Sequence, residues 1–448
     1  MKTRILFLLI LLIVYTPSLF AMGKTPPKPL NNEASFPDSP KELNLMECFD
    51  LAMKRSETLS IHKEDIAIAE AQIFQATGEA IGDADFIITD THQEVPKNPA
   101  TDSSGNSVGS TFNARERRER EFVITQPLFQ GFKSIAALTG AGNLKSQREE
   151  EWQRAKDLLF LDVARAFYTF LKMEKDVTAI QDINILFKDR IKDLEERSKI
   201  GRSRAGEVAT AKAIMKIHEA DLERAKGAKE IARYTLEFLT GSSLENTTLK
   251  DMTVVSQTED KLENLIGNSE YRSDVLAKES AMKTAKKAVL VAQSGFWPTI
   301  SLEHTQYEKR EGFQSGIDWD LMFKIDVPLF RGGSTFGEFK ESLSKWKQAK
   351  FSHQLAERQA KLEVRQSFQG WLSSKKESEA LQEAVKASDE NYKIQKEDYE
   401  KNLVNNLDVL QSLEALLDTS RNANSSFYQT KINFWELQVA SGNCCESL

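Results

Sequence analysis

Proline is scarce where a compact enzyme would need it. Only eleven of the 448 residues are proline, and six of these lie before residue 41. None occurs in residues 128–297 or 329–448. A proline inside a helix costs about 3 kcal/mol, and compact α/β folds use proline and glycine to end their elements. The two proline-free stretches therefore argue against an α/β enzyme and favour very long helices.

Cysteine and clustered histidine are rare as well. An odd number of cysteines, two of them adjacent, does not make a disulfide framework; they are Cys48, Cys444 and Cys445. The five histidines are scattered, without the spacing of metal ligands. Gly140-Ala141-Gly142 lacks the later glycine of a phosphate-binding loop. We predict no catalysis, no cofactor and no bound metal.

The chain has no excess of basic residues and no apolar run of membrane-spanning length. Its net charge of −7 and pI of about 5.6 argue against a nucleic-acid partner. The most apolar segment, Ile5–Tyr15, is shorter than the roughly 20 residues of a membrane helix. With basic residues before it and Ala21 after it, this segment predicts an export signal over residues 1–21, a buried N-terminal helix being the alternative. Residues 22–41 predict a disordered leader.

One supersecondary unit occurs twice. Gln126–Gly131 (QPLFQG) recurs as Val327–Gly332 (VPLFRG), 201 residues later. The same offset places Asp408 opposite Glu207 and Gly442 opposite Gly241. Two tandem repeats are therefore predicted. Their expected bounds are residues 42–241 and 262–442, with a linker over 242–261 and a tail over 443–448.

Upstream of these motifs the two repeats differ in length. Phe86–Thr89 corresponds to Ile300–Leu302 at an offset of about 214. This alignment makes Ala84 the counterpart of Pro298. The loop containing Pro96–Gly109 is expected to absorb the difference of about 13 residues between the two offsets.

Each repeat is expected to contain a pair of strands, at about residues 85–129 and 299–330. The four segments lack helical periodicity and are rich in Ile, Thr and aromatic residues: Phe86–Val95, Glu121–Phe129, Thr299–Glu308 and Trp319–Phe330. Ten residues cross a bilayer when the strand is tilted, although a small soluble sheet has the same pattern. Four strands cannot close a barrel, and open edges are not tolerated in lipid, so two or three chains would have to contribute.

The strand pairs are followed by helical hairpins with coiled-coil spacing. Residues 132–200 predict a helix of roughly 100 Å, and the return helix over 207–240 is half as long. We expect the segment 262–297 to complete that half-length helix. The second hairpin is expected over residues 331–440, with a turn at 402–406. Its half-length return helix would be completed by the N-terminal helix over residues 44–80.

These features resemble the TolC family of outer-membrane efflux proteins. The resemblance rests on the paired Leu-Phe-x-Gly motifs and on Leu43–Glu47, Phe296–Leu302 and Leu407–Leu410. It implies a mainly α homotrimer with a 12-stranded β-barrel in the outer membrane and an α-helical tunnel through the periplasm. The partners it implies are a periplasmic adaptor, an inner-membrane pump and outer-membrane lipid. The cargo would be small molecules or polypeptides, in efflux or type I secretion. The alternative is a soluble periplasmic coiled-coil adaptor or scaffold.

The second hairpin tip resembles the periplasmic gate of that family. Asp408 matches a position whose carboxylates ring the periplasmic mouth, and Gln411 stands where the family has a second aspartate. Tyr399 matches a gate tyrosine, but Val404 replaces its usual arginine partner. An acidic ring favours cations. The alternative for Asp408 is an ordinary acidic residue at a helix N-terminus.

The resemblance assigns further residues to docking and to the strand–helix junctions. The first tip matches the adaptor-facing turn and contains Gly201, Arg202, Arg204 and Gly206. The alternative is an ordinary solvated turn between two helices. The junction residues are Pro127, Phe129, Gly131, Pro298, Pro328, Phe330 and Gly332. Both chain ends are expected at mid-height, so a disulfide from Cys48 to Cys444 or Cys445 would be compatible with an oxidising periplasm.

Overall fold

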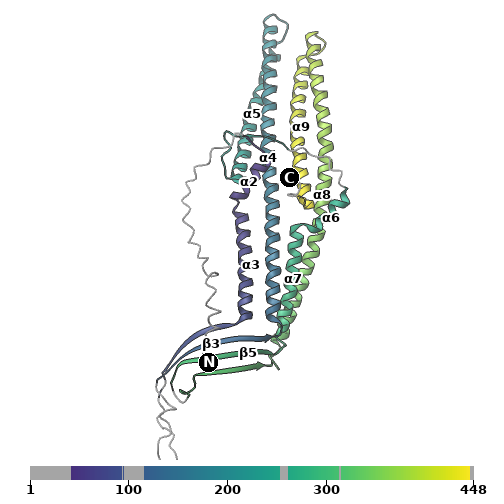
Figure 1. Cartoon of the computed structure of the whole chain (residues 1–448). Helices are drawn as coiled ribbons and strands as arrows, with labels where there is room; N and C mark the ends of the chain where they lie inside the picture. Colours follow the sequence, from purple (N-terminus) through teal and green to yellow (C-terminus); the bar gives the residue numbers. More distant parts are fainter. Residues whose placement is uncertain (1–41, 93, 95–115, 253–260, 312–313, 444–448) are drawn as a thin grey trace, which may run out of the picture.

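The computed structural model describes residues 42–92, 94, 116–252, 261–311 and 314–443. It is a long, mainly helical molecule with a β-sheet at one end and two helical tips at the other (Figure 1). The predicted signal peptide and leader, the loop containing Pro96–Gly109, and Cys444 and Cys445 lie outside the described residues.

Two helical hairpins of equal size form most of the length. In the first, α4 (Lys133–Lys199) has 67 residues and α5 (Ala205–Thr240) has 36. In the second, α8 (Ser334–Glu400) and α9 (Asn406–Ser441) have the same two lengths. At about 1.5 Å per residue the long helices span roughly 100 Å. The hairpins lie side by side because α4 packs against α9.

Five shorter elements fill the half of the molecule next to the sheet. They are α2 (Leu45–Arg55), α3 (Glu57–Ile81), α6 (Leu262–Asn268), the 3-10 helix η1 (Ser269–Tyr271) and α7 (Ser273–Ser294). Ser56 separates α2 from α3 and caps α3 by accepting a hydrogen bond from the Leu59 amide at 3.3 Å. The N-terminal helix is therefore broken, and so is the helix expected over residues 262–297.

The sequence predicted that residues 262–297 continue the return helix of the first hairpin and that residues 44–80 continue that of the second. The structure has the opposite pairing. At the end of α5, Gly241 is covered by the Arg55 side chain of α2. At the end of α9, Gly442 lies beside Asn268 and Arg272, where α6 ends and α7 begins. Thus α2–α3 continues α5, and α6–α7 continues α9. The two half-length segments are of similar length, so length could not decide which return helix each one continues. The linker after Gly241 is long enough to cross to the other hairpin.

The four long strands form one antiparallel sheet in the order β2-β3-β5-β6. Their bounds are Asp83–His92, Glu116–Gln130, Thr299–Arg310 and Trp319–Asp326. β6 ends at Asp326 and not at the predicted Phe330, because Asp326 pairs with Thr299, the first residue of β5. The residues after Asp326 therefore have no strand of the described chain beside them.

The sheet register also corrects the alignment of the repeats. Asp83 pairs with Thr125, and Thr299 pairs with Asp326. Since Asp326 lies 201 residues after Thr125, Thr299 is the counterpart of Asp83. The counterpart of Pro298 is consequently Gly82 and not Ala84. The sequence alignment was two residues out, which left every side chain on the correct face.

Two apolar clusters stabilise the helices at different heights. The larger cluster lies at mid-height and combines α2, α4 and α9; the Phe160 ring there packs edge-on against Phe49 and Trp435, with ring centroids 5.1 and 5.0 Å apart. The second cluster lies near the tips around Phe187 and Leu413. A two-stranded parallel sheet, β1 (Glu42–Leu43) with β4 (Thr248–Leu249), ties the linker to the start of α2.

No helix within the described ranges is both long enough and apolar enough to cross a membrane. In the same part of the chain, no group of three or more His, Cys, Asp or Glu side chains is arranged to hold a metal ion.

Candidate functional site: the hairpin tips, the inter-hairpin seam and the strand–helix junctions

The second tip places Asp408 in a helix cap. The Asn405 side-chain oxygen accepts hydrogen bonds from the amides of Leu407 (2.7 Å) and Asp408 (3.2 Å). In return, Asp408 Oδ2 accepts from the Asn405 amide at 3.0 Å. This reciprocal capping box explains why α9 begins here. The half-buried Asp408 and the exposed Gln411 are three residues apart, so they share one face of α9.

Tyr399 has an arginine partner that the sequence prediction missed. The Arg190 guanidinium lies over the Tyr399 ring, 3.8 Å from its centroid, and Arg197 lies at 4.9 Å. Both arginines belong to α4, in the other hairpin. Val404 packs against the tip cluster beside them. The signal for Arg190 was its heptad position: between Phe187 and Leu194, where an apolar residue is usual.

Arg190 joins the two hairpins near their tips. It is 6% exposed, and its Nε donates to the Asn406 side-chain oxygen at 3.0 Å. Its Nη1 donates to Asp193 at 3.0 Å. Burial lowers the pKa of Arg190, with Tyr399 and Asp193 acting in the opposite direction. A buried cation held by a ring, an amide and a carboxylate makes a specific tie between α4 and the start of α9.

The first tip is an exposed basic turn. Gly201 has φ 71°, in the left-handed region that favours glycine. Arg202 and Arg204 are exposed, and neither guanidinium forms an ion pair with the described residues. Gly206 is exposed in the first turn of α5. Ser203 donates a hydrogen bond to Glu207 at 2.8 Å, which fixes the turn and leaves both arginines pointing at solvent.

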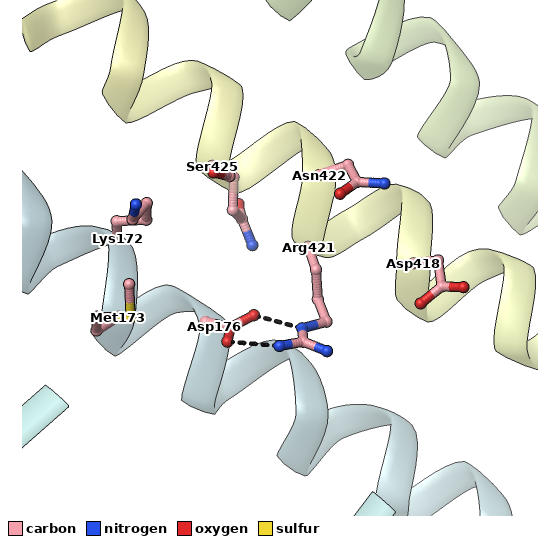
Figure 2. Close-up of a pocket in the computed structure, with 8 residues that line it drawn as sticks. Lys172, Met173, Asp176, Asp418, Arg421, Asn422 and Ser425 are labelled. Carbon is pink, nitrogen blue, oxygen red and sulfur yellow. Dashed lines mark hydrogen bonds and ion pairs between the residues drawn. The ribbon is translucent and has the colours of Figure 1, made fainter. Parts of the chain in front are cut away.

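A polar cavity lies in the inter-hairpin seam, which we define as the contact of α4 with α9 (Figure 2). Arg421 of α9 makes a bidentate ion pair with Asp176 of α4, at 2.6 and 3.0 Å. This pairing raises the pKa of Arg421. The cavity beside the pair has a volume of about 380 Å³, and its lining includes Lys172, Asp418 and Asn422.

One face of α9 is polar along its length. Its residues follow spacings of three, four and seven, which place them in one stripe; they are Asp408, Gln411, Asp418, Asn422, Gln429 and Asn433. Lys431 lies on the opposite side of the helix and is paired with Asp251 of the linker. The linker therefore covers one side of α9, and the polar stripe faces away from it.

The first strand–helix junction requires glycine at position 131. Gly131 has φ 59°, and a Cβ there would lie 2.7 Å from Trp297 Cβ and 2.9 Å from the Ser294 carbonyl oxygen. Phe132 follows with φ 65° and packs edge-on against Phe129 and Trp297, with ring centroids 5.4 and 6.4 Å apart. Pro127 lies at an irregularity in the β3–β5 register, while Pro298 directly precedes β5.

The second junction has the same backbone and no cover within the described chain. Gly332 also has φ 59°, but no atom lies within 4 Å of a Cβ built there. Leu329 and Phe330, which follow Pro328, are 91% and 88% exposed. The predicted junction residues thus occupy equivalent positions in two different environments.

The sheet has one apolar and one polar face. The register places these apolar side chains on the same face: Phe86, Ile88, Phe122, Ile124, Leu302, Leu321, Phe323 and Ile325. The opposite face carries most of the polar side chains, among them Asp85, Glu121, Glu303, Thr305, Tyr307, Asp320 and Lys324. One side of the sheet is therefore suited to hydrocarbon and the other to water.

Comparison with known proteins confirms the resemblance seen in the sequence. Residues 269–443 match the family model described as outer membrane efflux protein. No curated protein matches the chain. The fold is similar to that of the outer membrane protein VceC from Vibrio cholerae, with 19% identity, a TM-score of 0.79, and coverage of 89% of this chain and 96% of that one.

Two further solved structures have the same fold. The Campylobacter jejuni CmeC outer membrane channel has 17% identity and a TM-score of 0.77 over 89% of this chain and 86% of its own. The open Neisseria gonorrhoeae MtrE outer membrane channel has 19% identity and a TM-score of 0.72 over 89% of each chain.

Proposed function

We propose that this chain, similar in fold to outer membrane channels and matched to the efflux family over residues 269–443, is one protomer of a trimeric export duct. The duct would carry small molecules or polypeptides out of the cell, in a tripartite efflux or type I secretion system. One observation carries the proposal: a sheet with one apolar and one polar face stands at the end of helical hairpins of roughly 100 Å. That combination suits a barrel in the outer membrane that continues as a tunnel through the periplasm.

Assembly follows from surfaces that a single chain leaves open. α3 exposes Ile61, Ile68, Phe74 and Ile81. α8 exposes Phe351, Leu355 and Leu362 on the side opposite its buried Ala360 and Val364. Within the described chain α3 packs along α4 and not along α8. We propose that α3 of one copy packs against α8 of the next and that three copies close the tube.

The charges of these two helices are complementary. α3 contains five acidic residues and one lysine. The half of α8 nearest the sheet, residues 334–365, contains seven basic and four acidic residues. Charge complementarity directs the correct pairing of helices and disfavours contacts between two copies of α3.

The proposal is tested by locating the full-length protein and determining its assembly. We expect it in the outer-membrane fraction as a trimer that dissociates on heating, and we expect it to form ion-conducting pores in planar bilayers. A soluble monomer or dimer in the periplasmic fraction would instead support the coiled-coil adaptor that the sequence left as the alternative.

The second tip is proposed as the periplasmic gate of this duct. Three copies of the polar stripe on α9 would then face the tunnel, with Asp408 and Gln411 nearest its mouth. The contacts of Arg190 with Tyr399 of α8 and with Asn406 of α9 would hold the second tip against α4 in the closed state. The contact with Tyr399 supplies the arginine that is missing at Val404.

Replacing Asp408 with asparagine is expected to weaken cation block of the pore. Three carboxylates close to the axis would bind a multivalent cation, and asparagine removes the charge while retaining an oxygen that can accept the capping hydrogen bond. Single-channel current at increasing concentrations of a divalent cation measures the effect. Glu400→Gln, which neutralises an exposed carboxylate at the end of α8, is the control. Equal block in wild type and Asp408→Asn would refute the ring.

The first tip is proposed as the docking site for the periplasmic adaptor. Replacing both Arg202 and Arg204 with glutamate is expected to reduce cross-linking to the adaptor at least tenfold, because reversed charges meet the partner's complementary surface. Lys401→Glu at the second tip is the matched control. Undiminished cross-linking of the double variant, with the control also normal, would remove these arginines from the interface.

A further inference from the structure

The two strand–helix junctions share a glycine of the same φ and differ in what covers it. In the first, the Leu-Phe-x-Gly motif ends at Gly131 and is covered by Ser294 and Trp297, at the end of α7 and just beyond it. In the second, Gly332 has the same φ of 59°, and no atom of the described chain lies within 4 Å of a Cβ built there. A shared backbone geometry and glycine at both positions indicate a shared packing requirement, and only one of the two is met within the described chain.

Within the part of the chain that the structure describes, the two edge strands of the sheet also lack a partner on one side. Among the described residues, β2 pairs with β3 alone and β6 with β5 alone. Moreover, β3 continues to Gln130 beside β5, whereas β6 ends at Asp326. Unpaired backbone groups are not tolerated in hydrocarbon. Each edge therefore needs a strand, and the segment just after Asp326 needs one most.

We propose that β6 of one copy pairs with β2 of the next in the register that β3 and β5 adopt within the chain. This inference rests on the proposed function, because it assumes that several copies close one barrel. Within the chain, Ile124 pairs with His304, Gln126 with Leu302 and Gln130 with Thr299. Transferring these pairs to their repeat counterparts yields three contacts between copies, written here with the residue of the next copy second: Ile325 with Ile88, Val327 with Phe86 and Arg331 with Asp83.

The transferred register is chemically consistent at each of these positions. Ile325 would meet Ile88 and Val327 would meet Phe86, all on the apolar face of the sheet. Arg331 would meet Asp83, and neither forms an ion pair in the described chain. The segment after Asp326 would become strand, as the sequence predicts.

The proposed register places Phe323 beside Asp90, as Phe122 lies beside Gln306 within the chain. A shift of two residues in one direction would place Ile325 beside Asp90 and Arg331 beside Asp85, so the repeat, and not side-chain chemistry, selects between these two registers. The opposite shift places Arg331 beside Ile81, which loses the ion pair.

The same transfer supplies the missing cover at Gly332. The counterparts of Trp297 and Ser294 are Ile81 and Gly78, at the end of α3. Ile81 is exposed in the single chain. In the assembly, Ile81 of the next copy would lie against Gly332, as Trp297 lies against Gly131.

Cysteine cross-linking tests the register. In full-length protein carrying Cys48→Ala, Cys444→Ser and Cys445→Ser, we expect Ile325→Cys with Ile88→Cys to oxidise to a covalent trimer. Directly opposed residues on antiparallel strands have Cα atoms about 4.5–5.5 Å apart, within the range of about 4.4–6.8 Å that a disulfide needs. The control pair, Ile325→Cys with Phe86→Cys, is displaced by two residues, or about 6.8 Å along the strand, and should remain uncross-linked.

The outcomes separate the register from the proposed function. A covalent trimer from the control pair but not from the test pair would overturn the register and leave the trimeric duct standing. A native mass of three chains without a cross-link in either pair would also overturn the register. A native mass of one chain would overturn both the register and the proposed trimer.

Substitution at Gly332, in the second strand–helix junction, provides a second test. Gly332→Ala is expected to lower the heat stability of the trimer more than Gly333→Ala does. Both glycines have positive φ, 59° and 86°, so alanine is strained at either position, but only a Cβ at position 332 would meet the next copy. Gly333→Ala is the matched control for backbone strain, since its counterpart Phe132 carries a side chain at φ 65°. Reversing one charge of the Arg331–Asp83 pair should likewise weaken the trimer, and Arg331→Asp together with Asp83→Arg should restore it. Equal trimer stability in Gly332→Ala and Gly333→Ala, or no rescue by the double reversal, would count against the register.

Discussion

Replacing Gly82 with alanine is expected to destabilise the junction between α3 and the sheet strongly. Gly82 ends α3 with φ 98° and ψ −176°, a conformation that is essentially restricted to glycine. A Cβ there would lie 2.1 Å from the Thr125 carbonyl oxygen and 2.9 Å from Pro127 Cδ. Neither atom can withdraw, because one belongs to the β3 backbone and the other to a proline ring.

Strain and overlap together should destabilise the folded chain by about 3 kcal/mol or more. Denaturant unfolding of the protein in detergent, followed by circular dichroism, measures the loss. Gly142→Ala is the matched control, since Gly142 lies inside α4 and a Cβ built there meets no other part of the described chain within 4 Å; alanine there should stabilise by about 0.5–1 kcal/mol. Equal stabilities for the two variants would show that the α3–β2 junction rearranges to accept a side chain.

Removing the side chain of Arg272 is expected to have a comparable effect at mid-height. Arg272 is 2% exposed and pairs bidentately with Asp274, at 2.6 and 2.7 Å. It also donates to Glu363 at 2.7 Å and to the Ala440 carbonyl oxygen at 3.3 Å. One side chain therefore joins α7, α8 and the end of α9.

Arg272→Ala should cost about 3 kcal/mol, the lower end of the range for a broken buried pair, because Glu363 is half-exposed and partly screened by water. The unfolding free energy measures this cost. The control is Lys361→Ala, which breaks the nearby exposed pair with Glu270 and should cost less than about 1 kcal/mol. Similar losses for both variants would contradict a special role for Arg272.

The effect of Arg272→Ala should depend on pH. Burial alone raises the pKa of Asp274, but hydrogen bonds from Arg272 and the charges of Arg154 and Arg272 bring that pKa below its ordinary value. A carboxylate with a lowered pKa stabilises the fold fully above its unfolded pKa of about 4, and this contribution is lost as the pH falls through the folded value. The difference between wild type and Arg272→Ala should therefore shrink below about pH 4.

The long elements were predictable because local signals define them. Proline-free heptads specify α4 and α8 to within a few residues, and left-handed glycines end α5 and α9 at Gly241 and Gly442. The stacking of half-length helices was not predictable. It depends on whether the chain after Gly241 stays beside the first hairpin or crosses to the second, and helix length alone is the same in both arrangements.

The candidate site was predictable only in part. The tips and both strand–helix junctions follow from the repeat and from the family resemblance. The contact between Arg190 and Tyr399 does not, because it joins α4 to the end of α8, more than 200 positions later, through packing of one hairpin on the other. The absence of packing around Gly332 within the described chain was also not predictable, because the repeated motif predicts the same packing at Gly131 and Gly332. Only the structure shows that one junction is covered within the chain and the other is not.

The mid-height cluster has a consequence for biosynthesis. It contains Leu43 near one end of the described chain and Ala440 near the other, about 400 residues apart. At a synthesis rate of about 5–20 residues per second, these two residues are made roughly 20–80 s apart. During that interval the aromatic side chains of α2 and α4 have no α9 to pack against. The emerging chain therefore exposes apolar surface to holding chaperones for tens of seconds before α9 is available to complete the mid-height cluster.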